Sequence, residues 1–299
     1  MPGTLEIQAE LVRHLVGEQF PRWADLSVVP VARGGHDNRT FHLGREKIVR
    51  LPSGKEYVPQ IEKEAKWLPY LAERLTLPVP FPLAQGKPGA GYPFPWSVNR
   101  YVEGELLNGG SVPDMRRFAA DLADFLRELQ GIDPHGGPAA GEHTFFRGAS
   151  PMVYGEQTEA ALKELKKELP ARRLWEIWEA AAVKPERPPV WLHGDIAPGN
   201  LLVRDGTLCG VIDFGIMGVG DPACDYAMAW SFFDSGGREV FLRGLDEGTA
   251  ARARGWALWK ALITYRSPDA SFAASARHTI REILLESGMN MGFDHSSTI

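Results

Sequence analysis

The stretch from residue 191 to residue 215 constrains this chain more than any other, because it sets three polar residues among short apolar runs. The runs at 190–193, 201–203 and 208–212 are each bounded by Gly, Pro or Asp. This pattern predicts buried strands joined by tight turns. Asp195, Asn200 and Asp213 stand next to these runs, so each predicted strand delivers a polar residue at its end.

Two carboxylates and an amide in this order suit the transfer of a phosphoryl group. The reaction needs a carboxylate that orients the accepting hydroxyl and takes its proton, and oxygen ligands that hold Mg²⁺ against the phosphates. We expect Asp195 to be the base, and Asn200 and Asp213 to be the magnesium ligands. Each of them could instead be an ordinary turn residue, since Asp and Asn favour turns. The three residues taken together, in this order and spacing, favour a phosphoryl-transfer site over three unrelated turn residues.

A family resemblance is carried by two motifs, His-Gly-Asp-x-x-x-x-Asn at 193–200 and Ile-Asp-Phe-Gly at 212–215. Together they resemble the aminoglycoside phosphotransferase-like branch of the protein-kinase fold, a branch of small-molecule kinases in which His-Gly-Asp replaces His-Arg-Asp. The segment Gly-Asp-Pro-x-x-Asp at 220–225 matches it as well. The resemblance implies that the catalytic loop is supported by His193, Asp221 and Asp225.

The resemblance also implies an α+β fold with two lobes. A small lobe at 1–101 would hold an antiparallel β-sheet and one helix, and a larger, mostly helical lobe would follow at 102–299. The β-rich pieces at 28–32, 40–43 and 47–51 match the start of the small lobe. The turn with Gly34 and Gly35 would lie over the nucleotide, where missing side chains let backbone N–H groups approach phosphate. A plain hairpin turn is the alternative.

The third of these strands carries Arg50 where the kinase pattern expects a phosphate-binding Lys. Lys47 points to the opposite face of the strand, since side chains alternate. A guanidinium can bind phosphate through two parallel hydrogen bonds, so Arg50 is chemically acceptable. In the predicted helix at 60–75, Glu64 borders the apolar face more closely than Glu62 and should pair with Arg50. An exposed Arg and a solvated Glu remain the alternatives.

The Pro-rich segment from 78 to 95 leads to a strand that enters the predicted hinge between the lobes. In the resembling family, backbone groups of the hinge bind the base of the nucleotide. This places Arg100, Tyr101 and Val102 near the base, without deciding between ATP and GTP.

Helical periodicity is strongest at 111–130 and recurs in the second half of the chain, at 153–169, 171–183, 222–233, 238–245, 249–265 and 271–287. The resemblance puts the acceptor between the catalytic loop and the last of these helices. Carboxylates there could bind an ammonium group, or could simply be solvated. The candidates are Asp234, Glu282, Glu286 and Asp294.

Charge and composition limit the partners of the chain. The net charge of −5 leaves no basic surface for nucleic acid. It divides into +2 for residues 1–98 (12 basic, 10 acidic) and −7 for 99–299 (21 basic, 28 acidic), which weakly favours a cationic acceptor. No apolar run is long enough to span a membrane, and the first residues lack a basic-then-apolar pattern, so we expect neither a membrane span nor a secretory signal. The 2 cysteines suit a reducing cytoplasm.

The sequence therefore predicts an enzyme that moves the γ-phosphoryl group of ATP or GTP, with Mg²⁺, to a hydroxyl of a small cationic molecule. An aminoglycoside is the first expectation. The alternatives are a macrolide kinase, a kinase of a metabolic alcohol such as homoserine, choline or a sugar, or a nucleotide-binding pseudokinase scaffold suggested by the missing Lys at Arg50. The sequence does not indicate an oligomeric state.

Overall fold

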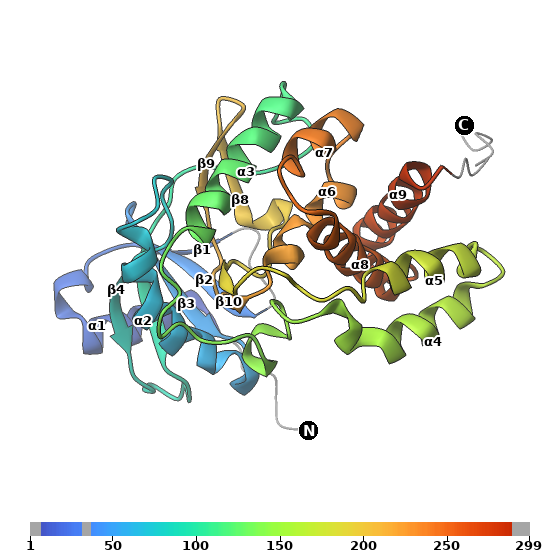
Figure 1. The fold of residues 1–299 in the computed structure, drawn as a ribbon. Helices are drawn as coiled ribbons and strands as arrows, with labels where there is room; N and C mark the ends of the chain where they lie inside the picture. Colours follow the sequence, from blue (N-terminus) through green and yellow to red (C-terminus); the bar gives the residue numbers. More distant parts are fainter. Residues whose placement is uncertain (1–6, 32–36, 289–299) are drawn as a thin grey trace. The chain divides into compact units, whose positions relative to one another are not determined.

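The computed structural model of the chain describes residues 7–31 and 37–288, and its elements are shown in Figure 1. Gly34, Gly35 and Asp294 lie outside these residues. The chain packs as two compact units. Unit 1 is the chain up to Leu106 with Asn200–Arg204 and Cys209–Ile216, and unit 2 is the remainder. The boundary expected at 101–102 stays a prediction.

Unit 1 contains an antiparallel sheet in the order β1-β2-β3-β5-β4. Four of its strands follow the sequence expectation, whereas the edge strand β4 was hidden by its Pro-rich flanks. Pro82 opens β4, which is one of the few places where a sheet accepts proline. The strands are β1 (Val28–Pro30), β2 (Asn38–Leu43), β3 (Lys47–Pro52), β4 (Pro82–Gly86) and β5 (Trp96–Arg100).

One face of this sheet forms an apolar core with helix α1 (Ala9–Gln19). Because side chains alternate along a strand, the core takes every second residue of β2, β3 and β5. The other residues, including Arg50, face the opposite side. The core side chains are Val12, Leu15, Val16, Val28, Phe41, Leu43, Val49, Leu51, Tyr92, Trp96 and Val98. Helix α2 (Val58–Ala72) contacts β4 and β5.

A second, three-stranded sheet has the order β6-β8-β9. Its strands are β6 (Glu105–Leu106), β8 (Leu201–Arg204) and β9 (Thr207–Val211). Asp205 and Gly206 make the tight turn between β8 and β9 with φ of 51° and 76°. This hairpin carries the chain from Asn200 to Asp213, so it fixes the two predicted metal ligands at its open end.

Unit 2 combines a short β-ribbon with helices. Strand β7 (Val190–Leu192) pairs with β10 (Gly218–Gly220) and contacts α3 (Met115–Gln130). Asp114 caps α3 by accepting the N–H of Arg117 at 3.0 Å. The other helices are α4 (Gly155–Leu165), α5 (Ala171–Ala180), α6 (Met228–Ser231), α7 (Ser235–Phe241), α8 (Glu247–Thr264) and α9 (Ala270–Glu286). Among the described helices, none is long and apolar enough to cross a membrane.

Helix α8 is the central helix of unit 2, because it packs against α4, α5 and α9 and against the 3₁₀ turn Pro222–Tyr226. Buried residues therefore surround it instead of forming a single stripe.

The close approach of two glycines should be essential for the packing of unit 2. A Cβ added to Gly220 would lie 2.4 Å from the carbonyl oxygen of Gly148, which is backbone and cannot move aside. We expect Gly220→Ala to lower the free energy of unfolding by about 1–3 kcal/mol, measured by urea denaturation. Gly155→Ala is the matched control, since a Cβ there meets no atom within 4 Å. Equal effects of the two changes would contradict this packing argument.

Candidate active site

In unit 1, the guanidinium of Arg50 bridges two carboxylates. Its Nη1 donates to both carboxylate oxygens of Glu64, at 2.6 and 2.8 Å, and its Nη2 donates to Oδ1 of Asp213 at 2.6 Å. Arg50 and Glu64 are buried, whereas the Asp213 side chain remains 41% exposed. The structure thus brings together the Arg50–Glu64 pair expected from the sequence; its binding of a nucleotide stays a prediction.

Burial and pairing act in opposite directions on these charges. Burial lowers the pKa of Arg50, but Glu64 and Asp213 raise it by more, so the guanidinium stays charged. Burial raises the pKa of Glu64, and Arg50 opposes that rise. Each partner therefore depends on the other, because a buried charge without its partner is costly.

The two predicted metal ligands lie on neighbouring segments of unit 1. The carbonyl of Asn200 accepts the N–H of Ile212 at 2.9 Å, which holds Asn200 beside the residue preceding Asp213. Asp213 has a φ of 64°, a left-handed conformation that is uncommon for a residue with a side chain. Such strain is concentrated at functional sites.

The donor set fits Mg²⁺, which accepts carboxylate and amide oxygens and keeps several waters. Within residues 7–31 and 37–288, no three His, Cys, Asp or Glu side chains gather in a way that could hold a metal. A magnesium ion would therefore depend on Asp213, Asn200, water and phosphate oxygens. It would also share Asp213 with Arg50.

Two polar residues on β5 were missed by sequence reasoning. Ser97 lies opposite Arg50 and Asn99 lies opposite Ile48 in the β3–β5 register, so both share the face of Arg50. They are 3% and 1% exposed, and their side-chain polar atoms have no hydrogen-bond partner among the described residues. The available signal was a polar residue at every second position between Trp96 and Arg100.

The predicted hinge residues line a cavity in unit 1 of about 550 Å³. Arg100, Tyr101 and Val102 form part of its wall, together with Phe81 and Cys209. The Arg100 guanidinium lies 5.1 Å from the Phe81 ring, which orients it along this wall. Arg50, Glu64 and Asp213 do not line this cavity, so it is separate from the ion-pair cluster.

In unit 2, the exposed Asp195 sits on a backbone that Asp225 holds in place. The fully buried carboxylate of Asp225 accepts the N–H of His193 at 2.8 Å and the N–H of Gly194 at 2.7 Å. Gly194 has a φ of 87°. The Asp195 N–H in turn donates to Nδ1 of His193 at 3.1 Å. The loop that presents Asp195 is therefore fixed by its own main chain.

Asp221 supports this region less directly. Its carboxylate pairs with Arg252 of α8, with Nε at 2.6 Å and Nη2 at 3.1 Å, and both side chains are buried. Its N–H donates to the carbonyl of Gly148 at 2.8 Å. Asp221 thus ties α8 to the segment that follows β10, whereas Asp225 contacts the catalytic loop itself.

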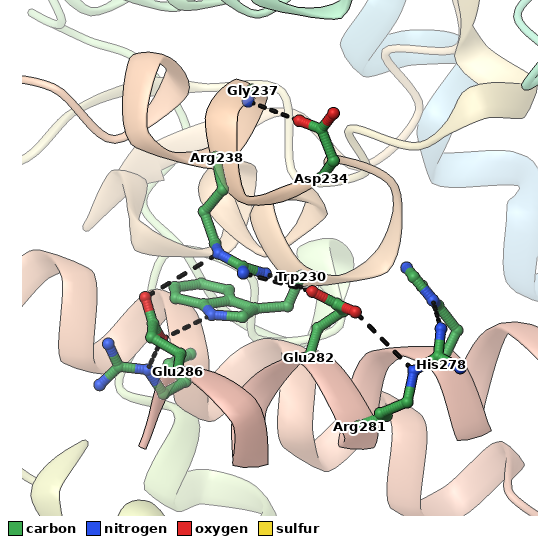
Figure 2. A network of polar contacts seen from close by, with 9 residues as sticks. Trp230, Asp234, Gly237, Arg238, His278, Arg281, Glu282 and Glu286 are labelled. Carbon is green, nitrogen blue, oxygen red and sulfur yellow. Dashed lines mark hydrogen bonds and ion pairs between the residues drawn. The ribbon is translucent and has the colours of Figure 1, made fainter. Parts of the chain in front are cut away.

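The three described candidates for ammonium binding already have partners within unit 2, as Figure 2 shows. Asp234 caps α7 by accepting the N–H of Gly237 at 2.7 Å. Glu282 accepts from Arg238 at 3.3 Å. Glu286 accepts from Trp230 at 2.8 Å and from Arg254 at 2.9 Å. Their binding of an acceptor stays a prediction, and these contacts give each of them a structural role.

The Arg50 bridge predicts a large and non-additive effect on stability. Arg50→Met should lower the free energy of unfolding by about 3–5 kcal/mol, because it leaves Glu64 buried and charged. Arg50→Met with Glu64→Gln removes both charges and should recover much of that loss. Urea denaturation of the single and double variants measures the difference. Lys47→Met is the control on the opposite face of β3, and additive single effects would contradict the bridge.

A second prediction concerns Lys63 of α2, whose pKa burial lowers to about 8 while Glu64 opposes the change. Between pH 8 and the unfolded value of 10.5, the unfolded chain binds the proton that the folded chain has lost. The free energy of unfolding should therefore rise with pH across this window. Lys63→Met should lack this rise. The free energy of unfolding of the parent minus that of Lys63→Met, measured by urea denaturation, should therefore increase from pH 8 to pH 10. A constant difference would contradict the burial of the ammonium.

Comparison with known proteins identifies the family of the chain. The family model described as the phosphotransferase enzyme family matches residues 28–262. An aminoglycoside 3′-phosphotransferase from Escherichia coli is 31% identical over 112 residues, which are 37% of this chain and 41% of that protein. The match thus spans about two-fifths of that relative.

Solved structures share the fold. The GDP complex of aminoglycoside 2′-phosphotransferase-IIIa aligns with a TM-score of 0.72 and 20% identity, covering 94% of this chain and 100% of that one. The macrolide 2′-phosphotransferase MphH from Brachybacterium faecium aligns with a TM-score of 0.60 and 22% identity, covering 91% and 98%. The expected α+β, two-lobed, protein-kinase-like fold is confirmed. Because the family model matches residues 28–262, which are well over half of this chain, the chain belongs to the phosphotransferase enzyme family.

Proposed function

We propose that this protein transfers the γ-phosphoryl group of ATP or GTP to a hydroxyl of a small molecule. The observation that carries the proposal is the exposed Asp195 carboxylate on a backbone held by Asp225. A carboxylate in fixed geometry is what such a transfer needs, because its catalysis is mostly positioning and charge neutralisation.

In the reaction, Asp195 orients the acceptor hydroxyl and takes its proton as the oxygen attacks the γ-phosphorus. A new bond forms between that oxygen and phosphorus, the bond to the β–γ bridging oxygen breaks, and the nucleoside diphosphate leaves with that electron pair. Asn200 and Asp213 would hold Mg²⁺, which supplies positive charge to the phosphate oxygens. Arg50 supplies a second cation with donors suited to phosphate.

Aminoglycosides and macrolides are the first acceptors to test, because similar proteins carry these names. Metabolic alcohols belong in the same panel, since a fold does not fix a substrate. A pseudokinase scaffold is disfavoured by the intact Asp195, Asn200 and Asp213. We place the protein in the cytoplasm, where nucleoside triphosphates are present and where Cys209 and Cys224 would stay reduced.

Release of nucleoside diphosphate in the presence of these acceptors tests the proposal. Asp195→Asn should lower kcat by about 10²–10⁴-fold with little change in nucleotide affinity, because it removes the base and leaves the nucleotide contacts of unit 1 intact. Asp213→Asn should mainly weaken the magnesium-dependent binding of nucleotide, measured by calorimetry. Asp205→Asn, in the exposed turn between β8 and β9, is the control. Full turnover by Asp195→Asn would overturn the assignment.

A further inference from the structure

A cation–aromatic cluster lies in unit 2 where the 145–148 loop meets α8. The Arg147 guanidinium lies 4.7 Å from the ring centre of Trp256 and 4.8 Å from that of Trp259. Tyr154 stacks on Trp259 with ring centres 4.0 Å apart and an interplanar angle of 15°. Two aromatic faces thus hold the guanidinium in one place, and a cation held in this way is already partly ordered before a ligand arrives.

The backbone that carries Arg147 is strained and firmly anchored. Phe145 and Phe146 have φ of 47° and 55°, values uncommon for residues with side chains. Gly148 lies so close to Leu192 that an added Cβ would be 2.6 Å from its side chain. Since β7 ends at Leu192, directly before the loop of Asp195, the Arg147 loop and the catalytic loop are supported by the same strand. Strain kept by surrounding structure is typical of functional loops.

Lys260 adds a second cation to this region. It is an exposed residue of α8 that interacts electrostatically with both Asp195 and Arg147. Desolvation lowers the pKa of its ammonium, Asp195 opposes this, and Arg147 adds to it. In the described part of the chain, neither Arg147 nor Lys260 forms an ion pair with a carboxylate. Asp225 also interacts electrostatically with Asp195, but its buried carboxylate is engaged by the N–H groups of His193 and Gly194.

The cluster also has an unused hydrogen-bond donor. The indole N–H of Trp256 is buried, with the residue 2% exposed, and finds no acceptor among the described residues. By contrast, the indole N–H of Trp259 donates to Oε1 of Gln157 at 3.0 Å. A buried donor left without an acceptor costs free energy, so a ligand oxygen that reached it would gain a hydrogen bond.

We propose that Arg147 and Lys260, with the indole N–H of Trp256, form a subsite for an oxyanion, so that the acceptor is a small alcohol carrying a carboxylate or phosphate group. This rests on the proposed function, because it assigns the acceptor for the hydroxyl that Asp195 activates. It differs from the cationic acceptor expected from the sequence. The carboxylates of Glu282 and Glu286 are neutralised by Arg238 and Arg254, whereas no described carboxylate forms an ion pair with Arg147 or Lys260.

Inorganic phosphate is the simplest probe of the subsite. Added at constant ionic strength, it should change the tryptophan fluorescence of the full-length protein in a saturable way, because Trp256 and Trp259 contact Arg147. Arg147→Gln and Lys260→Gln should each raise the dissociation constant for phosphate about tenfold or more. Arg147→Lys keeps the charge over the rings, so this variant should bind phosphate more tightly than Arg147→Gln does. Lys163→Gln, an exposed lysine of α4, is the matched control.

Four sugars that differ from one another in one group then test the class of acceptor. Glucuronate and glucose 6-phosphate should bind more tightly than glucose, and glucosamine more weakly, with the order lost in Arg147→Gln. The stronger of the two anions identifies carboxylate or phosphate as the recognised group. Circular dichroism of each variant checks that unit 2 remains folded.

The outcomes separate this inference from the proposed function. A phosphate response that Arg147→Gln leaves unchanged, or tighter binding of glucosamine than of glucuronate, would overturn the oxyanion subsite even if Asp195 catalyses phosphoryl transfer. Conversely, an anion response that depends on Arg147 in a protein with no transferase activity would support the subsite and count against the proposed function. Asp195→Asn distinguishes the two, since it should lose turnover while keeping the response to phosphate.

Discussion

Unit 1 depends on one buried guanidinium shared between two carboxylates. Arg50 lies on β3, Glu64 on α2 and Asp213 in the segment after β9. Glu64 is 14 positions and Asp213 is 163 positions from Arg50 in the sequence. Burying a charge costs several kcal/mol, and the cost is offset only where the partners keep close contact, so the three elements restrict one another's positions. Glu64 is fully committed to this contact, but Asp213 is partly exposed and can still meet a second cation. The interaction that orders unit 1 therefore also positions the guanidinium that we propose for phosphate and the carboxylate that we propose for the metal.

Unit 2 fixes its reactive group by a different route, through main-chain contacts. Asp225 is buried and accepts two successive backbone N–H groups, so the residues before Asp195 have one available conformation. Burial raises the pKa of Asp225, while His193 and the N–H donors oppose this and favour the carboxylate. The strained Arg147 loop is held by similar means, since the buried hydroxyl of Thr144 accepts the N–H of Gly141 at 3.1 Å and lies 2.9 Å from the carbonyl oxygens of Gly141 and Arg147. Fixed loops around an exposed carboxylate provide the preorganisation that positional catalysis requires.

The sequence predicted what depends on local pattern, and failed where partners come from distant elements. The strands and long helices were found because their periodicity is strong, and Glu64 was chosen over Glu62 because the apolar face of α2 fixes its direction. Strand β4 was missed because prolines obscure a strand that only its neighbour β5 stabilises. The pairing of Glu282 and Glu286 could not be predicted, since Arg238 and Arg254 lie on other helices. The Arg147 cluster depends on contacts across more than a hundred residues, and no local signal marks them.

The same limit explains why composition gives only weak support for the charge of the acceptor. A net charge of −7 over residues 99–299 is a sum over a large surface. A ligand responds instead to charges within roughly a Debye length, about 8–10 Å in physiological salt. Within that range, an acidic residue in contact with an arginine contributes little potential, as for Glu286 beside Arg254. An unpaired cation such as Arg147 contributes its full charge, strengthened where the surroundings exclude water. Selection of the acceptor is therefore governed by the few charges close to Asp195, which a sum over residues 99–299 does not identify.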